Sequence, residues 1–74
     1  MSRLPTTTPA KIIAGLKRAG FVEYHQKGSH LYFWHPIRKR MTSVAMHAKD
    51  LPRGTMKAIR KQAGFTEEEF RKLI

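Results

Sequence analysis

The sequence predicts an α+β domain in which helices pack on one face of a three-stranded antiparallel sheet. Three observations predict this fold: a helical pattern near the start of the chain, three strand-like segments joined by short turns, and further helical patterns towards the end. The expected order is helix, strand, strand, strand, helix and short helix. Packing the apolar side of each element into two layers leaves the other face of the sheet available to a partner.

The first helix is expected between Thr8 and Gly20. Thr is a favourable N-cap, and Pro9 fits the first turn because the amide hydrogen that it lacks would have no partner there. Gly20 ends the helix because glycine takes the left-handed conformation at low cost. One apolar stripe at helical spacing consists of Ile12, Ile13, Leu16 and Ala19. Residues 1–7 are expected to form a flexible lead-in to this helix.

Three segments rich in aromatic and β-branched residues are expected to be strands. They span residues 21–26, 30–35 and 40–47. The turns at residues 27–29 and 37–39 are short, so neighbouring strands run antiparallel. Pro36 ends the middle strand because it cannot donate a hydrogen bond to the sheet.

In the middle strand, both alternating sets of side chains contain apolar residues, so the alternation does not decide which set is buried. Tyr32 and Trp34 share one face with His30. The other face carries Leu31, Phe33 and His35. Core packing is the simpler interpretation of the aromatic residues, and stacking on unpaired bases is the alternative where their face is open.

The second helix is expected over residues 53–63, and Gly64 ends it. Its inward-facing apolar residues are Met56, Ile59 and Ala63. Its outward-facing cations are Lys57, Arg60 and Lys61. These cations are candidate phosphate contacts, with a plain solvated helix face as the alternative.

A short third helix begins after Thr66. Thr66 and Glu69 form a capping box, and Phe65 is placed to pack on Phe70 across the start of the helix. The acids of residues 67–69 lie at the positive end of the helix dipole. This structural role argues against a metal or catalytic cluster of carboxylates there.

A chain of 74 residues forms one small domain, residues 1–74, with a free energy of unfolding of about 4–11 kcal/mol. Fifteen Lys and Arg stand against five Asp and Glu, which gives a net charge of +10 and a pI near 10.8. This balance points to a polyanionic partner such as a nucleic acid, with a merely solvated surface as the simpler alternative. The basic residues are spread over several segments, which disfavours a membrane-surface helix.

The absence of cysteine excludes disulfides, thiolate zinc sites and cysteine nucleophiles. The longest apolar run has four residues, so no membrane-spanning segment is expected, and cytoplasmic residence is the default. Four histidines lie at residues 25, 30, 35 and 47, with only Glu23 as an acid near the first three. Neither a native metal site nor a small-molecule cofactor is expected.

His30 is the candidate catalytic residue. It begins a strand directly after Gly28 and Ser29, and Lys27 precedes them. A glycine turn lets a phosphate backbone approach closely, and a histidine can transfer a proton near neutral pH. RNA carries its own nucleophile in the 2′-hydroxyl group, so one histidine with nearby cations suffices for slow strand cleavage. From its position alone, a structural role is the simpler interpretation of a histidine at a turn.

The predicted arrangement is one that double-stranded RNA-binding domains use, and the sequence resembles the HicA family of toxins over nearly its whole length. The stretches that carry the resemblance are residues 12–21, residues 26–30, the pair His35-Pro36 and residues 51–64. A basic turn and a strand that ends at His47 lie between them. Each stretch is short, but their order and spacing together are fairly specific. The resemblance implies a double-stranded-RNA-binding-like fold of order αβββα.

The resemblance also implies that His30 is the catalytic residue of a metal-independent endoribonuclease that cleaves mRNA and so arrests translation and growth. It implies a protein partner as well, a HicB-type antitoxin that masks this histidine. In the mechanism that we expect, Lys27 holds the scissile phosphate and Ser29 helps to position it. His47 is a second candidate for proton transfer.

Two other classes of function suit the same charge and fold. A noncatalytic RNA- or DNA-binding module of similar fold would use the same cations and aromatic residues, but it would tolerate the loss of His30. An interaction protein could instead use its basic face for an acidic partner alone. RNA binding that does not change with salt concentration would argue against RNA as the main ligand.

Overall fold

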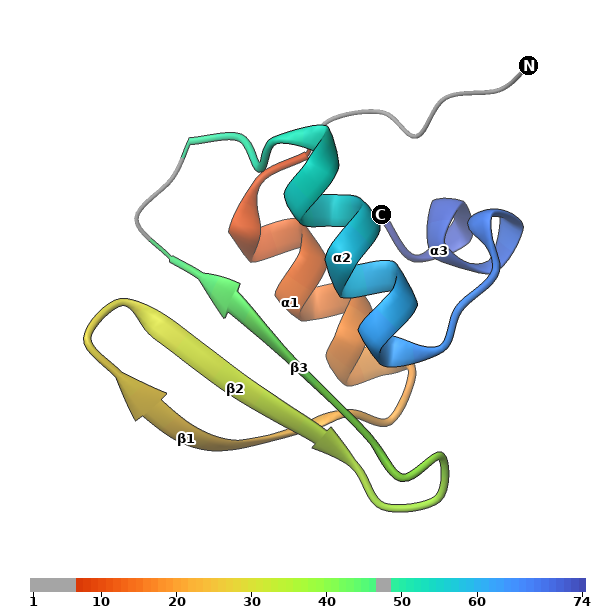
Figure 1. The fold of residues 1–74 in the computed structure, drawn as a ribbon, viewed down its shortest axis with the longest axis horizontal. Helices are drawn as coiled ribbons and strands as arrows, with labels where there is room; N and C mark the ends of the chain where they lie inside the picture. Colours follow the sequence, from red (N-terminus) through yellow and green to blue (C-terminus); the bar gives the residue numbers. More distant parts are fainter. Residues whose placement is uncertain (1–6, 47–48) are drawn as a thin grey trace.

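The computed structural model describes residues 7–46 and 49–74. The chain forms helix α1 (Pro9–Arg18), strands β1 (Val22–Lys27), β2 (His30–His35) and β3 (Arg40–Ala45), and helices α2 (Arg53–Ala63) and α3 (Glu67–Leu73). Figure 1 shows how these elements follow one another. The predicted order of elements is confirmed, and β2 and α2 have the predicted bounds.

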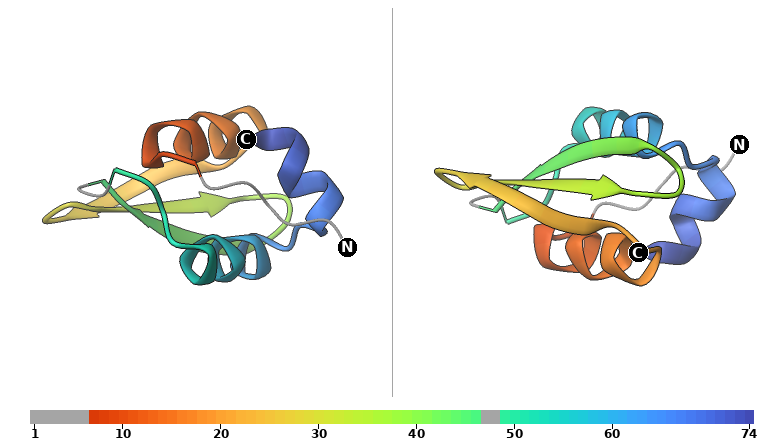
Figure 2. Two further views of the ribbon diagram at one scale, coloured as in Figure 1. Left: turned by 90° about the horizontal axis from the view of Figure 1, so that it is seen from above. Right: turned by 90° about the horizontal axis from the view of Figure 1, so that it is seen from below.

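The sheet has the strand order β1-β2-β3, and both pairs are antiparallel. β2 pairs with β3 without interruption, whereas the β1–β2 pairing contains a bulge between Glu23 and His25. The two views of Figure 2 show α1 and α2 on the same face of the twisted sheet, with α3 beyond its end. The opposite face is not covered by any element among the described residues. The expected two-layer α+β architecture is therefore confirmed.

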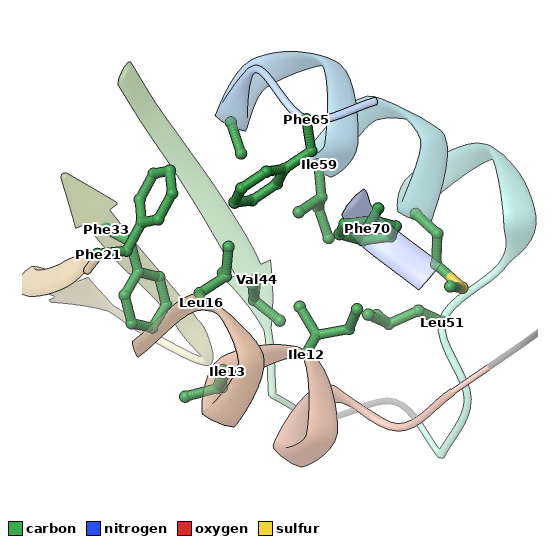
Figure 3. Packing of buried hydrophobic residues seen from close by; sticks show 12 residues of the cluster. Ile12, Ile13, Leu16, Phe21, Phe33, Val44, Leu51, Ile59, Phe65 and Phe70 are labelled. Atoms are coloured by element: carbon green, nitrogen blue, oxygen red, sulfur yellow. The ribbon is translucent and has the colours of Figure 1, made fainter. Parts of the chain in front are cut away.

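The core lies between the sheet and the helices, where side chains from all three helices and from β2 and β3 meet (Figure 3). Phe33 is fully buried, and Val44 of β3 is buried beside it on the same face of the sheet. The largest helical contributions come from Ile12, Leu16, Met56, Ile59 and Phe70. This arrangement decides what the alternation in β2 left open: the face that carries Phe33 packs against the helices.

The helix ends follow the predicted chemistry. The Thr8 side chain accepts a hydrogen bond from the Lys11 amide, and Gly64 ends α2 with a left-handed φ of 80°. At α3, the Thr66 hydroxyl accepts from the Glu69 amide, and the Glu69 carboxylate accepts from the Thr66 amide. This confirms the capping box.

Three expectations at the edges of these elements need correction. β3 ends at Ala45, before the predicted end at residue 47, and Met46 is in a turn. Thr7 was expected in the flexible lead-in, but it is buried, and its carbonyl oxygen accepts a hydrogen bond from the Leu51 amide at 2.9 Å. The start of the domain is thus tied to the segment before α2, while residues 1–6 lie outside the described residues. β1 extends through Lys27, so the turn between β1 and β2 consists of Gly28 and Ser29 alone.

None of the helices in the described part of the chain combines the length and apolar character that a membrane crossing needs.

Candidate functional site

The hairpin that joins β1 to β2 positions the candidate catalytic residue. Gly28 has a φ of +60° at the first central position of a two-residue turn, which is the arrangement of a type II′ hairpin turn. The Gln26 side-chain amide donates to the Gly28 carbonyl at 3.1 Å. A Cβ built on Gly28 would meet no atom within 4 Å, so the space over the turn is open. The turn is therefore a fixed and accessible end of the sheet.

His30 is the first residue of β2, and its side chain is exposed. It pairs directly with Lys27 of β1 and with Ala45 of β3. Directly opposed residues in an antiparallel pair point to the same face, so Lys27 and His30 lie side by side on the uncovered face of the sheet. The Ser29 carbonyl accepts a hydrogen bond from the Met46 amide at 2.7 Å, which holds the end of the turn against β3.

The structure does not bring all the predicted site residues together. Lys57 and Lys61 are exposed on α2, and α2 covers the face of the sheet that is opposite to His30. Arg60 is half-buried, and its guanidinium donates to the Phe65 carbonyl at 2.9 Å, so it connects α2 to the next loop instead of pointing freely outward. His47 lies outside the described residues.

His35, at the other end of β2, is a structural histidine. Its ring is buried, and Nδ1 accepts hydrogen bonds from the amides of Ile37 and Arg38 at 3.2 and 3.0 Å. Because Nδ1 accepts, the hydrogen of the ring is on Nε2, which donates to the Ala19 carbonyl at 3.0 Å. The ring also packs edge-on against Phe21, with 5.0 Å between the ring centroids. His35 therefore joins the turn after β2 to the end of α1.

The bulge in β1 gives the uncovered face an aromatic surface. His25 pairs with Tyr32, and the next register pair is Glu23 with Phe33, so Tyr24 is the extra residue. The ring centroids of Tyr24 and Tyr32 are 6.4 Å apart, and those of His25 and Tyr32 are 5.3 Å apart. Tyr24 and His25 therefore both lie next to Tyr32. Simple alternation would have put these two neighbours on opposite faces, and no signal in the sequence marks the bulge.

A shallow pocket continues this surface towards the end of β2 that carries His35. Tyr24, Trp34 and Met41 line it, and its volume is about 310 Å³. The Tyr24 hydroxyl donates to the Met41 sulfur at 3.6 Å, which links the two edge strands across Trp34. Tyr24 and Met41 are more than half exposed, whereas Trp34 is half-buried. We call the surface formed by Tyr24, His25, Tyr32, Trp34 and Met41 the aromatic face.

Glu23 and the three acids of α3 lie outside this surface. Glu23 is the only acid in the sheet strands, and it pairs with Phe33 on the helix-covered side. Glu67, Glu68 and Glu69 belong to the first turn of α3. The Thr66 backbone amide, which donates to the Glu69 carboxylate, lowers the pKa of this group below its usual 4.5, and the Thr66 hydroxyl and the positive charges of Arg38 and Lys72 act in the same direction. Within residues 7–46 and 49–74, no group of three His, Asp or Glu side chains forms a candidate metal site.

Comparison with known protein families gives one finding. Residues 9–65 match the family described as the HicA toxin of bacterial toxin-antitoxin systems. The matched segment begins at the first residue of α1 and ends after α2, so it includes the whole sheet and the His30 hairpin. A search among curated proteins found no match.

Proposed function

This chain belongs to the HicA toxin family of bacterial toxin-antitoxin systems, and from that premise we propose that it is a metal-independent endoribonuclease that cleaves mRNA with His30. The family places the protein as a toxin that has an antitoxin partner. The observation that carries the proposal is the position of His30. Its side chain is exposed at the end of a fixed hairpin and lies directly opposite Lys27 on an uncovered face.

In the proposed reaction, an imidazole nitrogen of His30 takes the proton from a 2′-hydroxyl group of the RNA. The 2′-oxygen then attacks the neighbouring phosphorus, and the bond from this phosphorus to the 5′-oxygen of the next nucleotide breaks. The leaving 5′-oxygen takes a proton from water, and His30 returns its own proton to the solvent. One product ends in a 2′,3′-cyclic phosphate. Because the nucleophile belongs to the RNA, this step calls for neither a metal-bound water nor a cofactor.

The residues around His30 have supporting roles in this proposal. The Lys27 ammonium group stabilises the negative charge that develops on the phosphate. Gly28 leaves the space above the turn open, so the phosphate backbone can approach without meeting a side chain. Ser29 can position the phosphate by donating a hydrogen bond from its hydroxyl group to a phosphate oxygen. Lys57 and Lys61 lie on the other layer, where they can bind only more distant phosphates.

The test compares wild type with His30→Ala on an end-labelled RNA in the presence of EDTA. We expect wild type to cleave and the variant to be slower by roughly 10²- to 10⁴-fold, the usual contribution of a general acid or base. Circular dichroism checks that the variant is folded, and an RNA-binding measurement checks that substrate still binds. Cleavage products without a cyclic or 3′-phosphate end would contradict the 2′-hydroxyl mechanism. Tight binding with no cleavage by either protein would favour a noncatalytic RNA-binding module.

We further propose that the antitoxin is of the HicB type and covers His30. The same exposure that admits a phosphate makes the hairpin end easy for a partner to block. The expected result is that the toxin with its bound antitoxin no longer cleaves RNA. An antitoxin complex that cleaves as fast as the free toxin would show that the partner binds elsewhere.

A further inference from the structure

We propose that the aromatic face binds unpaired RNA bases by stacking, with Tyr32 and Trp34 as the two main platforms. The inference rests on the proposed function, because it assigns the RNA a path along β2 from the cleavage site. It also specifies the substrate class as a single strand next to the scissile phosphate.

The first observation that supports stacking is the spacing of the side chains along β2. Tyr32 and Trp34 follow His30 at two and four positions, so all three lie on one face of one strand. With about 3.3 Å per strand residue, their Cα atoms lie roughly 7 and 13 Å from that of His30. A single strand laid along β2 with a phosphate at His30 therefore brings its next bases over Tyr32 and then over Trp34. Sheets of RNA-binding domains use aromatic residues to stack two or three bases in this way.

The second observation is that side chains of the neighbouring strands lie beside Tyr32 and Trp34 and extend the surface for stacking. Tyr24 and His25 flank Tyr32 with centroid distances of 6.4 and 5.3 Å. The pocket of about 310 Å³ next to Trp34 lies at the lower end of the usual range for ligand pockets, roughly 300–1,000 Å³. Its walls are the rings of Tyr24 and Trp34 and the side chain of Met41. These flat and polarisable groups suit the face of a base without selecting its hydrogen-bonding edge.

The third observation is charge, which favours an anionic partner such as RNA over a neutral protein surface. Among the strand residues on the face that carries His30 and the aromatic residues, Lys27 and His25 are basic and none is acidic, since Glu23 pairs on the helix-covered side. The whole chain carries a net charge of +10. A polyanion with exposed aromatic bases is complementary to both properties at once. A duplex does not fit, because its bases are already stacked and paired, so the proposal requires unpaired nucleotides.

The experiment uses the His30→Ala chain, which keeps the aromatic face and prevents cleavage under the proposed function. Trp34 is the only tryptophan of the protein, so its fluorescence reports directly on this face. We expect a short single-stranded RNA to quench the fluorescence of Trp34. An oligomer of the same phosphate number that lacks bases should bind more weakly and leave the fluorescence unchanged, and an RNA duplex should quench much less than the single strand.

Variants in the same background give the second readout, measured by the fluorescence anisotropy of a labelled RNA. Trp34→Leu and Tyr32→Leu should each weaken binding by roughly 5- to 150-fold, which corresponds to the usual 1–3 kcal/mol for one stacked base. Trp34→Phe retains a ring and should restore most of the affinity. Ile37→Ala is the matched control, because Ile37 is 86% exposed but lies in the turn after β2. Affinity for the base-free oligomer should not change in any of these variants.

The outcomes separate this inference from the proposed function. Quenching by single-stranded RNA together with absent cleavage by wild type would support the aromatic face and overturn the nuclease. Cleavage by wild type with full RNA affinity in Trp34→Leu and Tyr32→Leu, both folded by circular dichroism, would support the nuclease and overturn the inference. Unchanged Trp34 fluorescence on RNA binding would also overturn it and point to a protein partner on this face. If no RNA binds at all, both the proposed nuclease activity and the stacking of bases on the aromatic face are overturned.

Discussion

The two ends of β2 each carry a histidine, and the surroundings of the two rings differ. His30 is exposed beside a turn whose central glycine leaves open space, and it lies opposite a lysine. His35 is buried, and both of its ring nitrogens take part in hydrogen bonds to the backbone. One strand thus presents the same side chain once to solvent and once to the interior. The two residues are five positions apart on the strand, so His35 lies on the helix-covered face with Phe33, whereas His30 lies on the uncovered face.

The end with His35 is reinforced from several elements. Arg38 donates to the Gly64 carbonyl at 3.1 Å, and its guanidinium lies 4.6 Å from the centre of the Phe65 ring. Phe65 in turn packs near Phe21, with 5.9 Å between the ring centroids. This end connects the sheet to α1, α2 and α3, whereas the end with His30 is a hairpin supported by its neighbouring strands. A rigid end and an accessible end therefore share one strand.

The sharpest test of this contrast is the exchange of each histidine for alanine. His35→Ala should lower the free energy of unfolding by about 2–4 kcal/mol, because it leaves a cavity and removes the partners of three backbone groups. His30→Ala should change it by less than about 0.5 kcal/mol, as expected for an exposed side chain. Urea denaturation of both variants measures the difference. Equal losses in the two variants would remove the distinction between the ends.

The glycines near the two ends give the next test. Gly20 has a φ of +104°, and a Cβ there would lie 2.8 Å from Nε2 of His35. Gly20→Ala should therefore cost about 2–3 kcal/mol from backbone strain and the clash together. Gly28→Ala meets open space and should cost only about 1 kcal/mol from its left-handed backbone. Thermal and urea unfolding measure both values, and a larger loss in Gly28→Ala would contradict the proposed order.

A smaller effect is expected from the lysines near the two ends of β2, Lys27 at the end of β1 and Lys39 in the turn after β2. Lys27→Ala should lower kcat/KM for RNA cleavage roughly tenfold, because a hydrogen bond to a charged group contributes about 1.5 kcal/mol. Lys39→Ala, in the turn at the other end of β2, should leave cleavage nearly unchanged. Cleavage rates at matched salt concentrations measure both. Similar losses in the two variants would indicate a general effect of net charge in place of a local role for Lys27.

The smallest expected effect concerns pH at the reinforced end. The folded pKa of Glu69 is lowered by the Thr66 amide, so the capping box contributes stability above the usual carboxyl pKa of 4.5 and loses it as the pH falls through the lowered value. Wild type should unfold at a higher temperature than Glu69→Gln near pH 6, and the two curves should converge in acid. Glu68→Gln is the control, because Glu68 is exposed and outside the capping box. Parallel curves across the whole pH range would contradict this role.

Local chemistry explains why so much of the fold was predictable. The Thr8 cap, the left-handed Gly64 and the capping box at Thr66 are short-range signals, and each lies where the sequence predicts it. His30 was predictable as a candidate because a glycine turn marks its position without any knowledge of packing. The resemblance to the HicA family agrees with this reading and with the matched residues 9–65.

The remaining features depend on contacts between distant segments. The buried face of β2 could not be read from alternation, because both sets of side chains are apolar. Arg60 was predicted to be an outward-facing cation. In the structure its guanidinium donates to the Phe65 carbonyl, because the loop after α2 folds back onto the last turn of the helix. Only part of the aromatic face could be predicted from the sequence. Alternation assigns Tyr32 and Trp34 to one face, but the bulge that adds Tyr24 and His25 has no sequence signal.

The bulge has a consequence for how the free protein behaves at high concentration. β1 lies at an edge of the sheet, and all six of its residues are exposed. Such an edge offers unpaired backbone groups to which a second copy can add a strand. The bulge at Tyr24 interrupts the regular ladder, and Glu23 and Lys27 place charges on either side of it. The irregularity that turns Tyr24 towards the uncovered face therefore also makes the β1 edge a poorer template for an added strand.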